Sequence, residues 1–218
     1  MARKQDRPIA PRVSAPDLPD ALEDAIPRRY ADLQRSRLAG LAGDVDLEHA
    51  SLEECVIAAP SVETLALRGA TLIDVEISDI RAVSVVARDA TIRRLRITGG
   101  RIGTLDLADA GVAELELRDV RVDYLSFAGA RLEDVRIVDS TIRAIDLPQA
   151  RLTRVAFEGC RADEVDPRGM RAADLDLRGL DALSYLDVLA LRGATLTDDQ
   201  VRMLAPAFAA AAGIDVKG

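Results

Sequence analysis

The chain of 218 residues is dominated by a pattern that repeats every ten residues. In the thirteen decades from Ser51 to Leu180, the second position is always aliphatic, the fifth is never polar and the seventh is apolar throughout. The ninth position is Asp or Gly in eleven of the thirteen decades, with Ala59 and Gln149 as the exceptions. A repeat this short restricts the chain to architectures built by stacking one small unit.

Each unit is too short to be a helical hairpin. The apolar residues at the fifth and seventh positions have the two-residue period of a β-strand. Asp and Gly two residues later favour a turn, because both tolerate bent backbone conformations. The pattern therefore predicts a β-solenoid, in which short strands and turns wind into coils that stack on one another.

The tenth position of each decade indicates how many residues make one coil. Alternate decades carry only Ala there, from Ala70 to Ala150, whereas the decades between them are mixed, from Pro60 to Cys160. This alternation is expected if one coil contains twenty residues, so that alternate decades lie above one another. The region from Val45 to Leu180 would then form about seven coils.

Charged residues agree with this register. The fourth positions of alternate decades would stack into a ladder of opposite charges: Asp74, Arg94, Glu114, Asp134, Arg154 and Asp174. Stacked strands lie about 4.8 Å apart, so we expect ion pairs between successive coils. Each exposed pair is worth only about 0.5 kcal/mol, so the ladder supports the register more than it supports stability.

The stretches that begin at the stacked alanines resemble the pentapeptide-repeat family, whose loose motif is Ala-(Asp/Asn)-Leu-x-x. They are residues 70–74, 90–94, 130–134 and 150–154. The resemblance implies an all-β solenoid, a right-handed parallel β-helix with four pentapeptides in each coil. Every second pentapeptide departs from the motif, with a large residue such as Leu105 or Leu125 where the family prefers Ala. We expect these residues to widen or flatten the coil.

A leucine-rich repeat is the alternative fold, because it also contains a Leu-x-x-Leu-x-Leu pattern. Repeats of that kind are longer and have a helical or extended convex half, usually with Asn at the turn. Here both halves of the coil look alike and the chain contains no Asn. These differences favour the solenoid.

The repeat divides the chain into three regions. They are an N-terminal extension and cap over residues 1–44, the β-helix over residues 45–180, and a slipped final coil with a helix over residues 181–218. The extension starts with charged, proline-rich sequence, and we expect its first part to be disordered. Between Asp17 and Arg37 we expect a short helix that ends near Pro27, in a segment that covers the unpaired strands of the first coil.

The repeat slips near the C-terminus. The hexapeptide 67–72 recurs unchanged as residues 191–196, an offset of 124 residues that an insertion around residues 181–188 would explain. Thr197 and Gln200 then form a capping box that starts a helix. We expect Pro206 to bend or divide this helix and Gly213 to end it.

The C-terminal helix has an apolar face at helical spacing. Its candidate residues are Val201, Leu204, Ala205 and Phe208. The simplest role for this face is to cap the last coil. Family members with C-terminal dimer helices resemble this arrangement, which implies a homodimer through the same helix.

Residues suited to catalysis or to metal binding are scarce. Cys55 and Cys160 fall on inward positions five coils apart, too far for a disulfide. One His and two Cys do not supply a conventional zinc site. His49 lies at a turn position and has no repeated partner, so we expect it on a surface turn. We expect no enzymatic activity, no cofactor and no metal site.

Charge and hydropathy narrow the class of partner. The net charge of −8 argues against direct binding of nucleic acid through surplus Lys and Arg. The longest uncharged stretch, residues 203–214, is too short to span a membrane. The N-terminus lacks the apolar core of a signal peptide, so we expect a cytoplasmic protein without membrane contact.

One side of the predicted solenoid carries more acidic than basic residues. We define the acidic strip as Asp106, Asp123, Asp146, Asp163, Glu164 and Asp166. Carboxylates on a stiff scaffold can replace phosphates in a basic groove.

Some pentapeptide-repeat proteins imitate the charge and girth of duplex DNA and bind DNA gyrase. The resemblance therefore implies a non-enzymatic DNA mimic with DNA gyrase, or another DNA-binding protein, as its partner. The alternative is an interaction scaffold for an unknown protein, without any effect on gyrase. The modest net charge of −7 over residues 45–180 keeps this alternative open.

Overall fold

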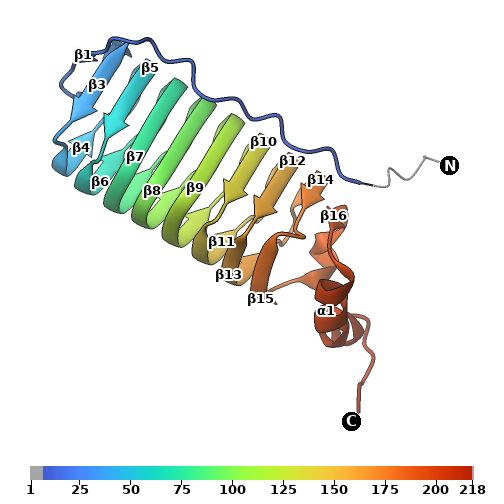
Figure 1. Cartoon of the computed structure of the whole chain (residues 1–218). Helices are drawn as coiled ribbons and strands as arrows, with labels where there is room; N and C mark the ends of the chain where they lie inside the picture. Colours follow the sequence, from blue (N-terminus) through green and yellow to red (C-terminus); the bar gives the residue numbers. More distant parts are fainter. Residues whose placement is uncertain (1–6, 218) are drawn as a thin grey trace.

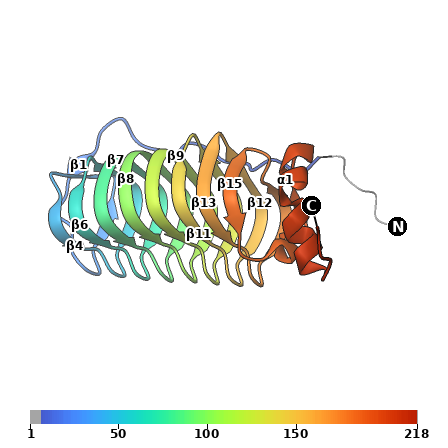
Figure 2. The ribbon, with the colours of Figure 1, turned by 90° about the horizontal axis from the view of Figure 1, so that it is seen from below.

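The computed structural model describes residues 7–217, which form one parallel β-solenoid closed at its C-terminal end by a helix (Figures 1 and 2). All sixteen strands belong to a single sheet. The strands are β1 (Glu23–Asp24), β2 (Asp32–Gln34), β3 (Ser36–Ala39), β4 (Ala42–Asp46), β5 (Ser51–Ala58), β6 (Ser61–Ala66), β7 (Thr71–Val86), β8 (Thr91–Asp106), β9 (Gly111–Ser126), β10 (Arg131–Val138), β11 (Thr141–Asp146), β12 (Arg151–Glu158), β13 (Cys160–Asp166), β14 (Arg171–Asp176), β15 (Leu180–Tyr185) and β16 (Ala194–Thr195). The helices are the 3-10 helix η1 (Val188–Leu191) and α1 (Asp198–Ala211).

Strand register confirms the twenty-residue coil. Leu72 of β7 pairs with Ile92 of β8, which pairs with Val112 of β9. The same offset continues from β9 to β10, β12 and β14. We number coil positions 1 to 20 from Ser51, so that position 1 recurs at Thr71, Thr91 and every twentieth residue after them. The solenoid has about eight turns, one more than the repeat predicts.

The additional coil lies before the recognisable repeat. Strands β2 and β3 pair with β5, and β4 pairs with β6, so the predicted boundary between residues 44 and 45 falls inside a coil. Asp32 pairs with Ser51 at an offset of nineteen residues, and the register shifts between Gly43 and Asp44. This one-residue deficit puts the coil out of phase with the decades. The short helix predicted before Pro27 is wrong, because β1 lies there and β2 and β3 follow.

The core confirms the inward positions. The second, fifth, seventh and tenth residues of the decades form one continuous buried cluster, almost entirely aliphatic, from Leu38 to Leu191. Phe127 and Phe157 are its only phenylalanines. Cys55 and Cys160 are buried in the same cluster with free thiols, as the sequence predicts.

The backbone conformation at the corners of the coil explains why Asp and Gly recur at the ninth position of the decades. Every ninth-position residue from His49 to Gly169 has positive φ, the left-handed region in which Asp and Gly are least penalised. Position 4 of each coil is also left-handed, from Glu54 to Asp174. Position 14 is not. Its residues include Thr64, Thr104 and Tyr124, whose branched or bulky side chains disfavour positive φ. The two halves of the coil therefore differ in backbone.

Helix α1 closes the C-terminal end (Figure 2). Thr197 and Gln200 form the predicted capping box, and the Gln200 amide also donates hydrogen bonds to the carbonyl oxygens of Leu177 and Leu180. Gly213 ends the helix with φ +74°, as expected. Pro206 lies inside one helix of fourteen residues and does not divide it.

The repeated hexapeptide does not keep its place in the coil. Ala70 lies at position 20, on the stacked alanine column. Ala194, its counterpart, instead pairs with Leu175 at position 5 of the last coil. Strand β15 keeps the twenty-residue offset from β13, but Ala194 follows Leu175 by only nineteen residues, so the last coil is one residue short and the insertion predicted around residues 181–188 is wrong. The same hexapeptide therefore occupies different coil positions at its two occurrences.

Candidate interaction surfaces

The acidic strip is assembled largely as the register predicts. Asp106, Asp146 and Asp166 lie at position 16 of their coils, in a column that also contains Ser126. Asp123 and Asp163 lie at position 13 and Glu164 at position 14, on the same strands. The strip thus flanks the corner at position 14.

Arginines neutralise much of this strip. Four of its six carboxylates form ion pairs, with nitrogen–oxygen distances of 3.1 Å for Arg88–Asp106, 3.0 Å for Arg101–Asp123, 3.8 Å for Arg143–Asp163 and 2.5 Å for Arg168–Asp166. Asp166 is buried, and hydrogen bonds from Arg168 hold its pKa below the ordinary value despite that burial. The field of the strip is therefore weaker than six free carboxylates would give.

Two members of the strip have no cationic partner among the residues described. The Tyr124 hydroxyl donates a hydrogen bond to Asp146. This bond and partial burial raise the pKa of Tyr124 to about 12, because ionised Tyr124 would face a carboxylate. Glu164 is exposed and forms no ion pair within residues 7–217.

A second charged column lies half a coil away. We define the position-4 ladder as Asp74, Arg94, Glu114, Asp134, Arg154 and Asp174. Arg94 donates two hydrogen bonds to Asp74, both 2.6 Å, and Arg154 donates bonds of 2.6 and 2.7 Å to Asp134. These two pairs confirm part of the ion pairing expected between successive coils, whereas Arg94–Glu114 and Arg154–Asp174 form no ion pair within residues 7–217.

Both paired carboxylates of the ladder are buried. Burial acts to raise the pKa of Asp74, but hydrogen bonds from Arg94 and from the backbone of Asp17 outweigh it and lower the pKa. The hydrogen bond from Arg154 is the main cause of the lowered pKa of Asp134. Both aspartates are therefore held in the charged form.

The N-terminal strap, which we define as residues 7–20, covers this ladder. Figure 1 shows it running along one edge of the rod, from the first coil towards the last. Its backbone N–H groups donate to four ladder carboxylates: Ile9 to Asp174 at 3.0 Å, Arg12 to Asp134 at 2.8 Å, Ser14 to Glu114 at 3.0 Å and Asp17 to Asp74 at 2.9 Å. Residues 1–6, where the predicted disorder begins, lie outside the described residues.

Sequence reasoning missed this contact. The strap has Pro at residues 8, 11, 16 and 19, which favours an extended chain without internal hydrogen bonds. That composition is equally typical of disorder, so the sequence alone does not indicate what the strap binds.

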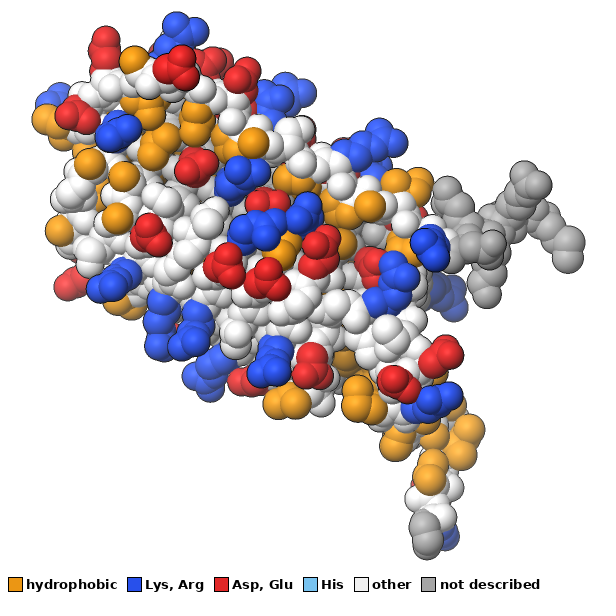
Figure 3. Space-filling view, in the orientation of Figure 1, with side chains coloured by type: hydrophobic (Ala, Val, Ile, Leu, Met, Phe, Trp, Pro, Cys, Tyr) orange, Lys and Arg blue, Asp and Glu red, His pale blue; other side chains and the backbone are white. Residues whose placement is uncertain are grey.

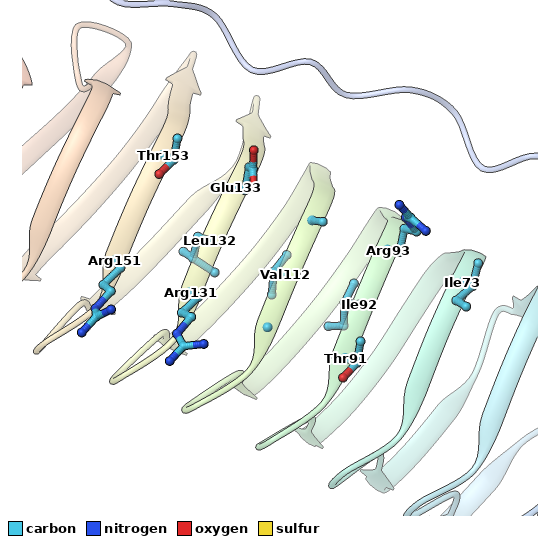
Figure 4. Close-up of a pocket in the computed structure, with 12 residues that line it drawn as sticks. Ile73, Thr91, Ile92, Arg93, Val112, Arg131, Leu132, Glu133, Arg151 and Thr153 are labelled. Carbon is cyan, nitrogen blue, oxygen red and sulfur yellow. The ribbon is translucent and has the colours of Figure 1, made fainter.

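An open depression of about 600 Å³ lies beside the strap. The residues that line it include the small Gly111 and Ala113, at positions 1 and 3 of one coil. Figure 4 shows Arg93 and Glu133 on the side that faces the strap and Arg131 and Arg151 side by side on the far side. Arg131 and Arg151 form no ion pair with any described residue.

The candidate dimer face of α1 is divided between two environments. Leu204 packs against the core cluster and Phe208 is half-buried, so both serve the cap. Val201, 47% exposed, and Ala205 face solvent. Exposed Leu183, Leu186 and Leu189 add apolar surface at this end, where hydrophobic side chains gather in Figure 3.

Within residues 7–217, no group of three or more His, Cys, Asp or Glu side chains is placed to hold a metal ion. His49 lies on an exposed turn, as predicted, and stacks on Tyr30 with ring centroids 5.3 Å apart. None of the helices described is both long and apolar enough to cross a bilayer.

Comparisons with known proteins return structures only. No protein-family model matches the chain, and no curated protein matches it. Two trypsin-treated variants of QnrB1, a plasmid-mediated fluoroquinolone resistance protein, are among the matching structures. The first is 16% identical with a TM-score of 0.33, covering 91% of this chain and 100% of that one. The second is 15% identical with a TM-score of 0.32, covering 89% and 95%.

The register of this chain itself shows the architecture. That register joins parallel strands at twenty-residue intervals around an aliphatic core. The chain is a parallel β-solenoid with the coil length that its resemblance to pentapeptide repeats predicts.

Proposed function

We propose that this chain is a non-enzymatic scaffold that binds a protein partner through charged columns on its solenoid. The main support is the parallel register that continues from β3 to β14, because it fixes outward side chains in columns about one strand spacing apart. A surface ordered in advance loses little conformational entropy on binding. Mixed acidic and basic side chains along the rod in Figure 3 suit recognition of another charged surface.

The specific partner that we propose is a DNA-binding protein such as DNA gyrase. The acidic strip supports this proposal, since three of its carboxylates stack in one column on a rigid rod. Arginine pairing reduces the charge that the strip presents, so we expect micromolar rather than nanomolar binding. Asp146 and Glu164 are the carboxylates with the least competition from Arg.

A supercoiling assay tests the gyrase proposal. Micromolar wild-type protein is expected to inhibit gyrase, and the triple variant Asp123→Asn, Asp163→Asn, Glu164→Gln to inhibit several-fold less. The matched control is Asp79→Asn, Asp119→Asn, Asp139→Asn, which removes the same charge at left-handed corners that Asn tolerates. Absence of wild-type inhibition would exclude gyrase. The scaffold proposal would then require another partner whose binding distinguishes the same two variants.

We also propose that the solvent-facing part of α1 forms a homodimer contact. Sedimentation at micromolar concentration is expected to show a dimer that the double variant Val201→Glu, Ala205→Glu converts to a monomer. The control Ala207→Glu, Ala211→Glu places the same charges on other exposed positions of the helix. A monomeric wild type, or equal effects of the two variants, would refute the contact.

A further inference from the structure

The spacing of the strap contacts matches the spacing of the coils. Eight residues separate Ile9 from Asp17, while their acceptors, Asp174 and Asp74, are five coils apart. Five coils correspond to roughly 24 Å at one strand spacing per coil, or about 3 Å per strap residue. Polyproline II rises about 3.1 Å per residue. An extended proline-rich chain therefore fits the ladder without stretching.

Prolines also select which amides are presented. Three of the four donors directly follow a proline, in Pro8-Ile9, Pro11-Arg12 and Pro16-Asp17. Proline has no N–H, and polyproline II leaves its amides free of internal bonds. The ladder thus recognises backbone amides, which any extended peptide with a similar proline pattern would offer.

The strap is held shallowly. Pro16 is the only buried residue among residues 7–20, and the four donor residues are exposed. The hydrogen bonds to the ladder are therefore its main attachment, and they lie near solvent. A segment held in this way can be displaced by a competing peptide.

The ladder is organised without the strap. Arg94 and Arg154, both from the solenoid, fix the carboxylates of Asp74 and Asp134. Glu114 and Asp174, by contrast, have no cationic partner in the part of the chain described. When the strap leaves, four acceptors remain in line, two of them rigidly oriented.

We propose that the position-4 ladder is a docking track for an extended, proline-rich peptide of a partner protein, and that the strap is its resting occupant. The track lies half a coil from the acidic strip, so it is an additional surface and does not depend on the gyrase proposal. Recognition is through backbone amides of the peptide, supplied at intervals of two or three residues.

Release of the strap is tested first, in the full-length protein. The double variant Ser14→Pro, Asp17→Pro removes two of the four N–H donors. The matched control, Ala10→Pro, Ala15→Pro, adds two prolines at residues that donate nothing to the ladder. Tryptic cleavage after Arg12 is expected to be at least about fivefold faster in the donor variant than in the control or wild type. Equal cleavage of all three proteins would overturn the docked strap.

Binding in trans is tested with a fluorescent synthetic peptide of residues 7–20. We expect the donor variant to bind it at least about tenfold more tightly than the wild type or the control, because a tethered strap competes at high effective concentration. Adding Glu114→Gly and Asp174→Gly should weaken binding at least about fivefold, and Gly suits their positive φ.

Each outcome of the binding experiment has one meaning. Faster cleavage without peptide binding up to about 1 mM would overturn the track while leaving the strap described correctly. If the two Gly substitutions leave the affinity for the peptide unchanged, the peptide binds outside the position-4 ladder, and the proposed track is wrong. Neither result changes the outcome of the supercoiling assay, so failure of the track and failure of the gyrase proposal are distinguishable.

Discussion

The position-4 ladder and the acidic strip around position 14 both contain several carboxylates, but the two regions hold them differently. At position 4 the backbone is left-handed, Asp74 and Asp134 are buried, and their arginines come from the next coil. Near position 14 the backbone is not left-handed, and pairs such as Arg143–Asp163 are largely exposed. Similar composition therefore produces a structural network on one side and a solvated surface on the other.

The difference follows from what covers each corner. The strap lies over the position-4 ladder and donates backbone hydrogen bonds to its carboxylates. No described segment covers the acidic strip, so its exposed ion pairs, such as Arg143–Asp163, are screened by solvent, whereas Asp166 is buried by the solenoid itself. Burial, rather than the number of charges, decides how much each pair contributes.

Removing one arginine from each corner should give the largest contrast. Arg94→Met leaves Asp74 buried without its cationic partner, and we expect a loss of about 2–3 kcal/mol in the free energy of unfolding. Arg143→Met removes a solvated pair and should cost less than about 0.5 kcal/mol. Equilibrium denaturation of both variants checks this, and equal losses would contradict the comparison.

Acid should weaken the position-4 corner. The pKa values of Asp74 and Asp134 are lower in the folded state, so their stabilisation is complete above the ordinary carboxyl pKa of about 4 and is lost as pH falls through the folded values. The double variant Asp74→Asn, Asp134→Asn should be less stable at pH 7 but lose less between pH 5 and 3. Melting temperatures across this range test the slope. Asp123→Asn, Asp163→Asn is the control that should retain it.

High pH should remove the stabilisation that Tyr124 contributes at position 14. The pKa of Tyr124 is raised to about 12 in the folded state, so its contribution is present below the ordinary pKa of about 10 and is lost as pH rises towards 12. Asp146→Asn removes the carboxylate and should lower the pKa of Tyr124. Burial, not Asp146, is the main cause of the raised pKa of Tyr185, also about 12. Spectrophotometric titration should therefore show that Asp146→Asn lowers the pKa of Tyr124 and leaves the raised pKa of Tyr185 unchanged.

The smallest expected effects have opposite signs. Ala59 has φ +42°, so Ala59→Gly relieves backbone strain and should stabilise the protein by up to about 1 kcal/mol. Ala144, at position 14, has no such strain, and Ala144→Gly should destabilise by about 0.5–1 kcal/mol through added unfolded-state entropy. The same sign in both denaturation curves would show that the backbone at position 9 and the backbone at position 14 do not differ as described.

The fold was largely predictable because each coil repeats the same short-range pattern. Aliphatic spacing, the alanine column from Ala70 to Ala150 and the turn residues each predict the register independently. The first coil was not recognised because it is one residue short. The recurrent hexapeptide wrongly indicated an insertion, because the last coil is also one residue short. The coil length brings the members of the acidic strip close together, but which arginines pair with which carboxylates, as in Arg88–Asp106 and Arg168–Asp166, depends on side-chain geometry that the repeat does not encode.

By itself, the sequence determined the coil length, the inward residues, the left-handed turn positions and the capping box of α1, because each depends on residues near one another in the chain or repeated at a fixed interval. Only the tertiary structure decided which carboxylates are buried and which remain exposed. The contacts between the strap and the ladder join residues 57 to 165 positions apart, and no local preference encodes such a pairing. Whether a charge stabilises the fold or faces a partner depends on what lies over it.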